Sequence, residues 1–202
     1  MIAVVSYGVC NVGSILNMLR KVGAPAEAVS APSGIERAEK LILPGIGAFD
    51  NGMNALTDRG LADPIRARAR QNTPVLGICL GMQLLSEGSE EGVLSGLGLV
   101  KGRCLRFPVS ADPQLRVPHM GWNVLSPRRE SLLLNGLGRD ARFYFVHSYH
   151  LACHEAADVL ATAQYGVEFT AMVQRDNVWG AQFHPEKSHK YGMALLRNFA
   201  SL

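Results

Sequence analysis

Short apolar runs alternate with helical patterns through the first half of the chain. Strands that alternate with helices are typical of an α/β fold whose sheet is mainly parallel. The run Val75–Ile78 contains no polar residue, which predicts a central strand buried on both faces. The expected strands are Ile2–Ser6, Ala26–Val29, Lys40–Leu43 and Pro74–Ile78, and the expected helices are Gly13–Val22 and two stretches within Ala48–Gln71.

The second half of the chain is richer in strand patterns. Arg175, Asp176 and Asn177 predict a hairpin turn, and apolar residues spaced by three and four predict a closing helix at 193–199. We therefore expect one domain over residues 1–202, a three-layer α/β sandwich with a mostly parallel central sheet and a smaller antiparallel part in the second half. The later strands are expected within Leu97–Phe107, Trp122–Leu125, Phe143–Val146, Val159–Ala163, Phe169–Gln174 and Val178–Phe183.

The composition argues against a nucleic-acid or membrane partner. The net charge is only +3, and the densest basic run, Arg66, Arg68 and Arg70, alternates with alanine and has no aromatic residue to stack on bases. The longest apolar stretch, Val75–Leu85, is far shorter than the ~20 residues that span a bilayer. The N-terminus lacks the basic start of a signal peptide, so we expect a cytoplasmic protein.

The four cysteines are far apart and include no CxxC pair. This spacing indicates neither a metal site nor a disulfide framework, and we expect no cofactor. Each cysteine must therefore be judged by its own surroundings.

Cys79 lies in the segment Gly77–Gly81, a G-x-C-x-G motif between a predicted buried strand and a helical run. This is the cysteine version of the nucleophile elbow, in which a sharp strand-to-helix turn exposes the nucleophile at the end of the sheet. Glycines on both sides let the crossing backbones approach. The helix start favours a thiolate and offers the Leu80 N–H to an oxyanion. The motif alone leaves open a buried structural cysteine; Cys10 lacks the flanking geometry and is the weaker candidate.

The segment His184-Pro185-Glu186 follows the last predicted strand. Proline disfavours the helical region for the residue before it, and an extended segment sends residues two apart to the same side. His184 can therefore act as acid and base for the thiol while Glu186 orients its ring. By itself the motif is a weak signal, because a loop that exposes a glutamate has the same sequence.

A small-residue turn, Leu43–Ala48, follows another predicted strand. Backbone N–H groups at Gly45, Ile46 and Gly47 could approach a substrate carbonyl there and form an oxyanion hole. The turn resembles a dinucleotide-binding motif, but Asp50 occupies the position of the third glycine and would repel a pyrophosphate. The segment Gly8–Ser14 resembles a phosphate-binding loop but lacks its lysine.

The three motifs in this order resemble the class I (triad) glutamine amidotransferases over nearly the whole chain. The resemblance implies that Cys79 attacks glutamine and forms a glutamyl thioester, that His184 is the acid and base, and that Glu186 is the orienter. It also implies that Gln83 and the backbone around His147, Ser148 and Tyr149 hold the substrate.

Within that family, the segments Tyr7–Ser14, Pro118–Asn123 and Phe143–Tyr149 and the residue Lys187 resemble the glutaminase subunits of imidazole glycerol phosphate synthases. This implies a (βα)8-barrel cyclase partner in a heterodimer, which uses the ammonia to make imidazole glycerol phosphate in histidine biosynthesis. We expect Asn11, Trp122 and Lys187 at that interface, although Trp122 could instead belong to the core. Glutaminases of other synthases, cysteine hydrolases of other classes and a non-catalytic regulatory module are the alternatives.

Overall fold

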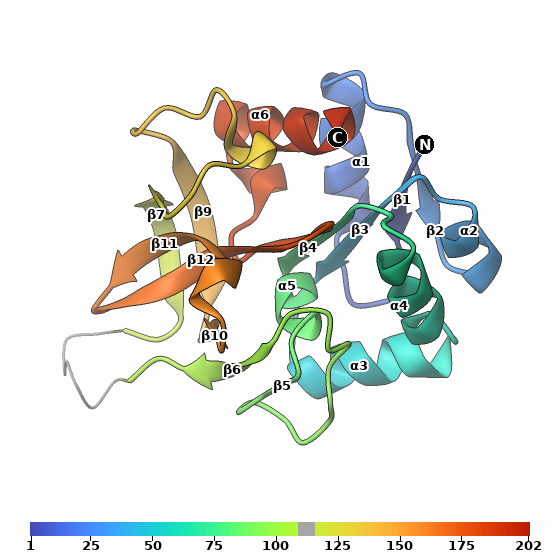
Figure 1. The fold of residues 1–202 in the computed structure, drawn as a ribbon, viewed down its shortest axis with the longest axis horizontal. Helices are drawn as coiled ribbons and strands as arrows, with labels where there is room; N and C mark the ends of the chain where they lie inside the picture. Colours follow the sequence, from blue (N-terminus) through green and yellow to red (C-terminus); the bar gives the residue numbers. More distant parts are fainter. Residues whose placement is uncertain (109–115) are drawn as a thin grey trace.

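A parallel sheet forms the centre of the molecule in the computed structural model, which describes residues 1–108 and 116–202 (Figure 1). The order of its parallel strands is β2, β1, β3, β4 and β13, and β4 is buried along its whole length as predicted. Their bounds are Ile2–Val5 for β1, Ala26–Val29 for β2, Lys40–Gly45 for β3, Val75–Cys79 for β4 and Val178–Ala181 for β13.

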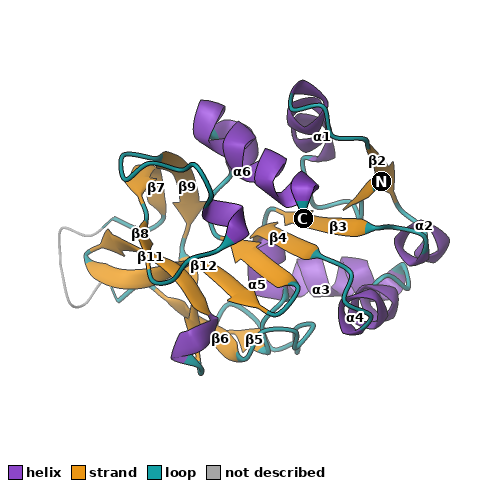
Figure 2. Cartoon of the chain, turned by 45° about the horizontal axis from the view of Figure 1, so that its top comes forward, coloured by secondary structure: helices purple, strands orange, loops and turns teal. Residues whose placement is uncertain are grey.

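Helices cover both faces of this sheet, which confirms the predicted three layers (Figure 2). Val4 and Ile42 face α1 and α6, whereas Val5 and Leu43 face α2, α3, α4 and α5. Within residues 1–108 and 116–202, no helix has the length and apolar character needed to cross a membrane. The helices are α1 (Val12–Lys21), α2 (Pro32–Glu36), α3 (Phe49–Asp58), α4 (Ala62–Arg70), α5 (Leu80–Leu84) and α6 (His189–Ser201).

The second half of the chain adds the predicted antiparallel part. β12 pairs with β13 through the predicted turn, where Asp176 has a φ of 50°. β7 and β9 form a separate two-stranded sheet beside β11 and β12 (Figure 1). These strands are β5 (Gly88–Ser89), β6 (Gly102–Arg106), β7 (His119–Val124), β8 (Ser126–Pro127), β9 (Arg142–His147), β10 (Tyr149–Cys153), β11 (Val159–Tyr165) and β12 (Val167–Arg175).

Several elements differ from the sequence-based expectation: α2, β5 and β8 were not predicted, and β7 begins at His119, whereas Trp122 was expected. Two further differences affect the main sheet. The strand expected at Leu97–Phe107 begins only at Gly102, because the Leu97, Leu99 and Val100 amides donate to carbonyls at the end of α5 instead of to a strand. β10 was not expected at all. It joins the main sheet between β12 and β6, so its partners lie far away in the sequence.

Candidate active site

Cys79 is the last residue of β4 and the residue that precedes α5. Its backbone has φ 54° and ψ −113°, a conformation that residues other than glycine rarely adopt and that costs about 1–3 kcal/mol. Strain of this kind is typical of a nucleophile elbow, in which the sharp strand-to-helix turn exposes the nucleophile at the end of the sheet.

The two glycines of the motif allow the turn to close. A Cβ atom on Gly81 would lie 1.7 Å from the Leu43 carbonyl oxygen of β3, and one on Gly77 would lie 2.7 Å from the Gly81 carbonyl oxygen. Gly45 is equally constrained, since its Cβ would meet the Tyr7 hydroxyl at 2.5 Å. Glycine at these three positions is therefore a requirement of close backbone packing.

His184 and Glu186 form a buried pair next to Cys79. The distance from His184 Nδ1 to Glu186 Oε1 is 2.7 Å, and both side chains are only 3% exposed. The His184 backbone N–H donates to the Tyr144 carbonyl and ties this segment to β9. His184 Nε2 is buried and has no nitrogen or oxygen partner in the described residues, which leaves this atom to serve the thiol.

The surroundings of His184 favour its protonated form. Burial alone lowers the pKa of His184, but hydrogen bonding to Cys79 and Glu186 and the negative charge of these two groups outweigh burial and raise the pKa to about 10. These contacts favour the imidazolium form of His184, which can donate a proton to a leaving amine.

Burial disfavours the thiolate form of the other three cysteines. Burial raises the pKa of Cys10, and its Sγ contacts the Val5 carbonyl oxygen at 3.6 Å. Burial likewise raises the pKa values of Cys104 and Cys153 to about 12. All four cysteines are free thiols, and the described residues contain no group of three or more histidine, cysteine or acidic side chains that could hold a metal.

Cys79 and His184 open into a cavity of about 500 Å³. Glu91, Pro118 and Val146 also line the cavity but were not predicted to, because each comes from a loop or strand whose position depends on long-range pairing. Gly45, expected among the substrate residues, is the buried last residue of β3 and does not line the cavity. The expected substrate residues that do line it are Ile46, Gly47, Leu80, Gln83, His147, Ser148 and Tyr149.

Gln182 lies behind the nucleophile and was also missed. Its side chain is fully buried, with Nε2 at 3.9 Å from Cys79 Sγ and Oε1 accepting from Gln83 Nε2 at 3.1 Å. A glutamine in the apolar run that precedes His184 was the signal in the sequence, because a buried amide requires hydrogen-bond partners.

The expected oxyanion groups differ in availability. The Ile46 N–H donates to the Val9 carbonyl at 2.9 Å, so in this structure it is not free for a substrate. Leu80 is the first residue of α5, and an N–H at that position has no acceptor within its own helix. The Leu80 amide is therefore the available donor beside the thiol.

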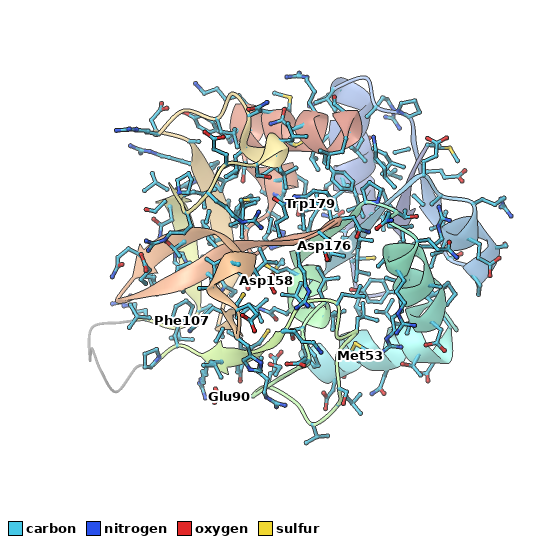
Figure 3. All side chains as sticks on the ribbon, viewed as in Figure 1. Met53, Glu90, Phe107, Asp158, Asp176 and Trp179 are labelled. Atoms are coloured by element: carbon cyan, nitrogen blue, oxygen red, sulfur yellow. The ribbon has the colours of Figure 1, made fainter. Side chains whose placement is uncertain are left out.

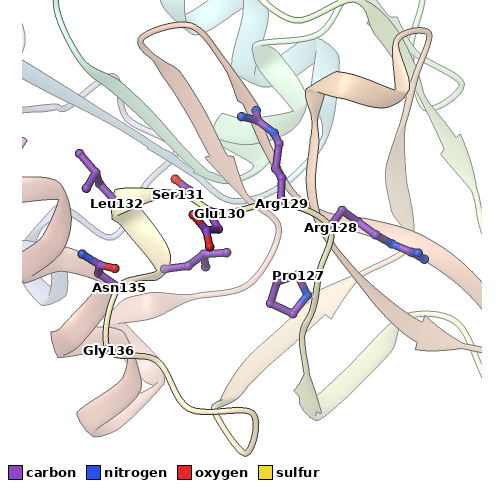
Figure 4. Close-up of a pocket in the computed structure, with 9 residues that line it drawn as sticks. Pro127, Arg128, Arg129, Glu130, Ser131, Leu132, Asn135 and Gly136 are labelled. Atoms are coloured by element: carbon purple, nitrogen blue, oxygen red, sulfur yellow. The ribbon is translucent and has the colours of Figure 1, made fainter.

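A larger hollow of about 720 Å³ lies elsewhere on the surface, along residues 127–132 and 134–136 (Figure 4). Its wall contains Arg128, Arg129, Glu130 and Ser131 but neither Cys79 nor any other residue expected in the site. This hollow is larger than the cavity at Cys79, but only the cavity at Cys79 contains the groups that the chemistry requires, so it is the candidate active site.

The residues expected at a partner interface lie near the active site. Trp122 is 47% exposed, which excludes the core alternative, and its ring stacks on His189 with a centroid distance of 5.5 Å. Lys187 lies over the Tyr144 ring at 5.7 Å. Asn11 is the residue before α1, and α1 contacts the 3-10 turn Pro185–Lys187 that follows His184.

Comparison with known proteins agrees with the geometry. The family described as glutamine amidotransferase class-I matches residues 3–201. Imidazole glycerol phosphate synthase subunit HisH 2 of Pseudomonas aeruginosa is 51% identical over 100% of both chains, and that of Methanococcus maripaludis is 48% identical over 98% of both. The solved structure of PurLQS from Thermotoga maritima has a TM-score of 0.76 at 21% identity, covering 99% of this chain and 97% of that one, which supports the fold.

Proposed function

The chain belongs to the class-I glutamine amidotransferase family, and from this premise we propose that it is the glutaminase subunit of an imidazole glycerol phosphate synthase. The relatives that carry this name match it over nearly their whole length. The observation that carries the chemistry is the buried His184–Glu186 pair beside the strained Cys79, at the wall of a cavity that also contains Gln83.

The first half of the reaction forms a thioester. Cys79 attacks the side-chain amide carbon of glutamine as a thiolate, with its proton held on His184, and the Leu80 N–H stabilises the oxyanion that develops on the amide oxygen. The C–N bond then breaks as His184 gives its proton to the leaving nitrogen. The products of this half are ammonia and a glutamyl thioester on Cys79.

The second half regenerates the enzyme. His184, now neutral, takes a proton from water, and the resulting hydroxide attacks the thioester carbon. Cleavage of the C–S bond gives the side-chain carboxylic acid, which releases its proton to solvent and leaves as glutamate. The thiolate is returned, and His184 keeps the proton taken from water. Glu186 accepts a hydrogen bond from Nδ1 at 2.7 Å and keeps Nε2 directed to the reacting atoms.

A cyclase subunit of (βα)8-barrel form is the proposed user of the ammonia. Three contacts support this: Lys187 lies in the turn that follows His184, Trp122 stacks on His189, and Asn11 precedes α1, which contacts that turn. A partner that covers this side would let ammonia reach its acceptor without crossing bulk solvent.

The proposal is tested by a Cys79→Ser variant of the chain assembled with the cyclase. We expect glutamine-dependent synthesis of imidazole glycerol phosphate to be abolished, because only ammonia generation requires the thiolate. Synthesis with added ammonium should remain at the wild-type level. Cys153→Ser is the matched control, since that thiol lies outside the cavity.

Two outcomes would contradict the proposal. Near-normal glutamine hydrolysis by Cys79→Ser would exclude Cys79 as the nucleophile. Wild-type protein that releases ammonia from glutamine but supports no imidazole glycerol phosphate formation with the cyclase would indicate a glutaminase of another synthase.

A further inference from the structure

A continuous set of hydrogen bonds connects the strand β7 with the nucleophile. On β7, the Asn123 amide lies 3.5 Å from His119 Nε2, and His119 Nδ1 lies 3.0 Å from His147 Nε2. His147 Nδ1 lies 2.8 Å from the Tyr149 carbonyl oxygen. The two histidines are 3% and 6% exposed, so water does not compete for these contacts.

The direction of every hydrogen bond in this set is fixed by its two ends. The Tyr149 carbonyl can only accept, so His147 Nδ1 carries a proton, and in a neutral ring Nε2 must then accept from His119 Nδ1. His119 Nε2 in turn accepts from Asn123 Nδ2. The Asn123 amide cannot rotate to reverse this, because Nδ2 also donates to the Gln164 carbonyl at 2.9 Å and Oδ1 accepts from the Val124 N–H.

Both rings must stay neutral for this arrangement, and their surroundings ensure it. His119 stacks between Tyr165, with a centroid distance of 4.0 Å, and Phe145, at 5.0 Å. Phe107, labelled in Figure 3, lies 5.2 Å from the His147 ring. Burial among these aromatic rings lowers the pKa of His119 to about 4 and that of His147 to about 3.

The same Tyr149 carbonyl oxygen also binds Gln83 in the active-site cavity. Gln83 Nε2 donates to Tyr149 O and to Gln182 Oε1, both at 3.1 Å, and Gln182 Nε2 lies near Cys79 Sγ. These two contacts use both N–H groups of Gln83. No hydrogen bond involves its Oε1 in the described residues, so this oxygen is the acceptor left for a ligand.

We propose that His119 and His147 are positioning residues for glutamine: they hold the Tyr149 carbonyl, and through it the Gln83 side chain, so that Gln83 Oε1 accepts a hydrogen bond from an N–H group of the substrate. The inference rests on the proposed glutaminase function. It assigns these roles to the imidazole rings, whereas the resemblance to the family implied only the backbone around His147.

The test is steady-state glutamine hydrolysis by the full chain in complex with the cyclase. His147→Phe keeps the ring volume and loses the donor to Tyr149, whereas His147→Asn keeps an amide donor close to the position of Nδ1. We expect the KM for glutamine to rise about five- to tenfold in His147→Phe with a smaller change in kcat, as expected for the loss of one hydrogen bond. His147→Asn should restore most of this loss.

His150→Phe is the matched control. His150 contacts the same Phe107 ring at 4.9 Å, but among the described residues its Nδ1 has no hydrogen-bond partner and it takes no part in the hydrogen-bonded set. Its KM should equal that of the wild type. His119→Phe, one step farther from the cavity, should raise KM less than His147→Phe and serves as the second variant if His147→Phe does not fold.

The inference is overturned if folded His147→Phe has an unchanged KM. If His147→Phe does not fold, an unchanged KM in folded His119→Phe overturns it. Equal losses in His147→Phe and His147→Asn would also overturn it, because a purely structural role depends on ring packing and not on the donor. Failure of the proposed function is a separate result, since the wild-type complex would then release no ammonia from glutamine.

Discussion

His184 and Glu186 are ionisable side chains that are buried together and shielded from water. Both side chains of this 2.7 Å contact are buried, and Glu186 Oε2 has no hydrogen-bond partner among the described residues. A carboxylate held in this way depends on the imidazolium for its stability. The two residues therefore act as one unit, and the loss of either should affect the other.

His184→Ala and Glu186→Ala should differ in the severity of their effect on glutamine hydrolysis. Removal of His184 eliminates proton transfer and should reduce kcat about 10³-fold or more, whereas loss of the orienter should cost less. Rates of ammonia release by the two variants in the assembled synthase measure the difference, with ammonium-dependent synthesis as the control. Equal and mild losses would contradict the assigned roles.

The buried histidines predict how stability depends on pH. Because the folded-state pKa values of His119 and His147, about 4 and about 3, lie below 6.5, the unfolded chain binds these protons first as the pH falls. Their contribution to stability is complete above about pH 6.5 and decreases toward pH 4, by about 1.4 kcal/mol per pH unit for each ring.

Urea unfolding between about pH 6.5 and pH 5 measures this slope before most carboxylates titrate. His119→Phe should have a smaller slope than the wild type, because one of the two buried rings no longer titrates. An identical slope in the variant would show that His119 is not buried in a neutral form.

At the scale of elements, the strand-to-helix turn at Cys79 is shaped by β3 as much as by its own sequence. β3 and α5 pack so closely that Gly81 has no room for a side chain against the Leu43 carbonyl. The thiol reaches the cavity only because this crossing is tight. The Leu80 N–H, the available oxyanion donor, is placed by the same crossing.

Gly81→Ala should therefore destabilise the protein by about 3 kcal/mol or more, since the added methyl group meets backbone atoms that cannot rotate away. Gly13→Ala is the control, because a Cβ on Gly13 in α1 has no atom within 4 Å and should be neutral or stabilising. Urea unfolding of both variants tests the difference. Similar stability of the two proteins would contradict the packing argument.

At the scale of the whole molecule, catalytic groups and an exposed apolar strand lie close together. The outer face of β7 carries Met120, Trp122 and Val124, which are 61%, 47% and 43% exposed, while His119 points inward from the same strand. Exposed apolar rows of this kind are typical of protein interfaces. The strand thus connects the proposed partner surface with the proposed glutamine site.

Trp122→Ala should weaken cyclase binding by about 30-fold, the loss expected for an aromatic anchor. Its thermal melt should match that of the wild type, because the ring is half-exposed. Leu132→Ala is the control, since Leu132 is 66% exposed but lies at the hollow of Figure 4, which contains none of the expected site or interface residues. Unaltered binding would remove Trp122 from the interface, and a strongly lowered melt would show that its stacking supports the fold.

Local chemistry was sufficient to predict the α/β order, the buried strand before Cys79, the elbow glycines and the facing of His184 and Glu186. Each of these follows from backbone constraints within a few residues, such as the restriction that Pro185 imposes on His184. The predicted alternation of strands and helices likewise depends on hydrophobic periodicity, which is a local property.

Only the tertiary structure decided which distant groups share the cavity. Four features depend on contacts between segments far apart in the sequence. They are the position of Gln182 beside Cys79, the hydrogen bond from the Ile46 amide to Val9, the start of β6 at Gly102, and the contact between His119 of β7 and His147 of β9. Hydrophobic periodicity specifies which face of an element is buried, but not which neighbour it meets. That choice was made by strand order and register, and it determines the environment of each side chain in the site.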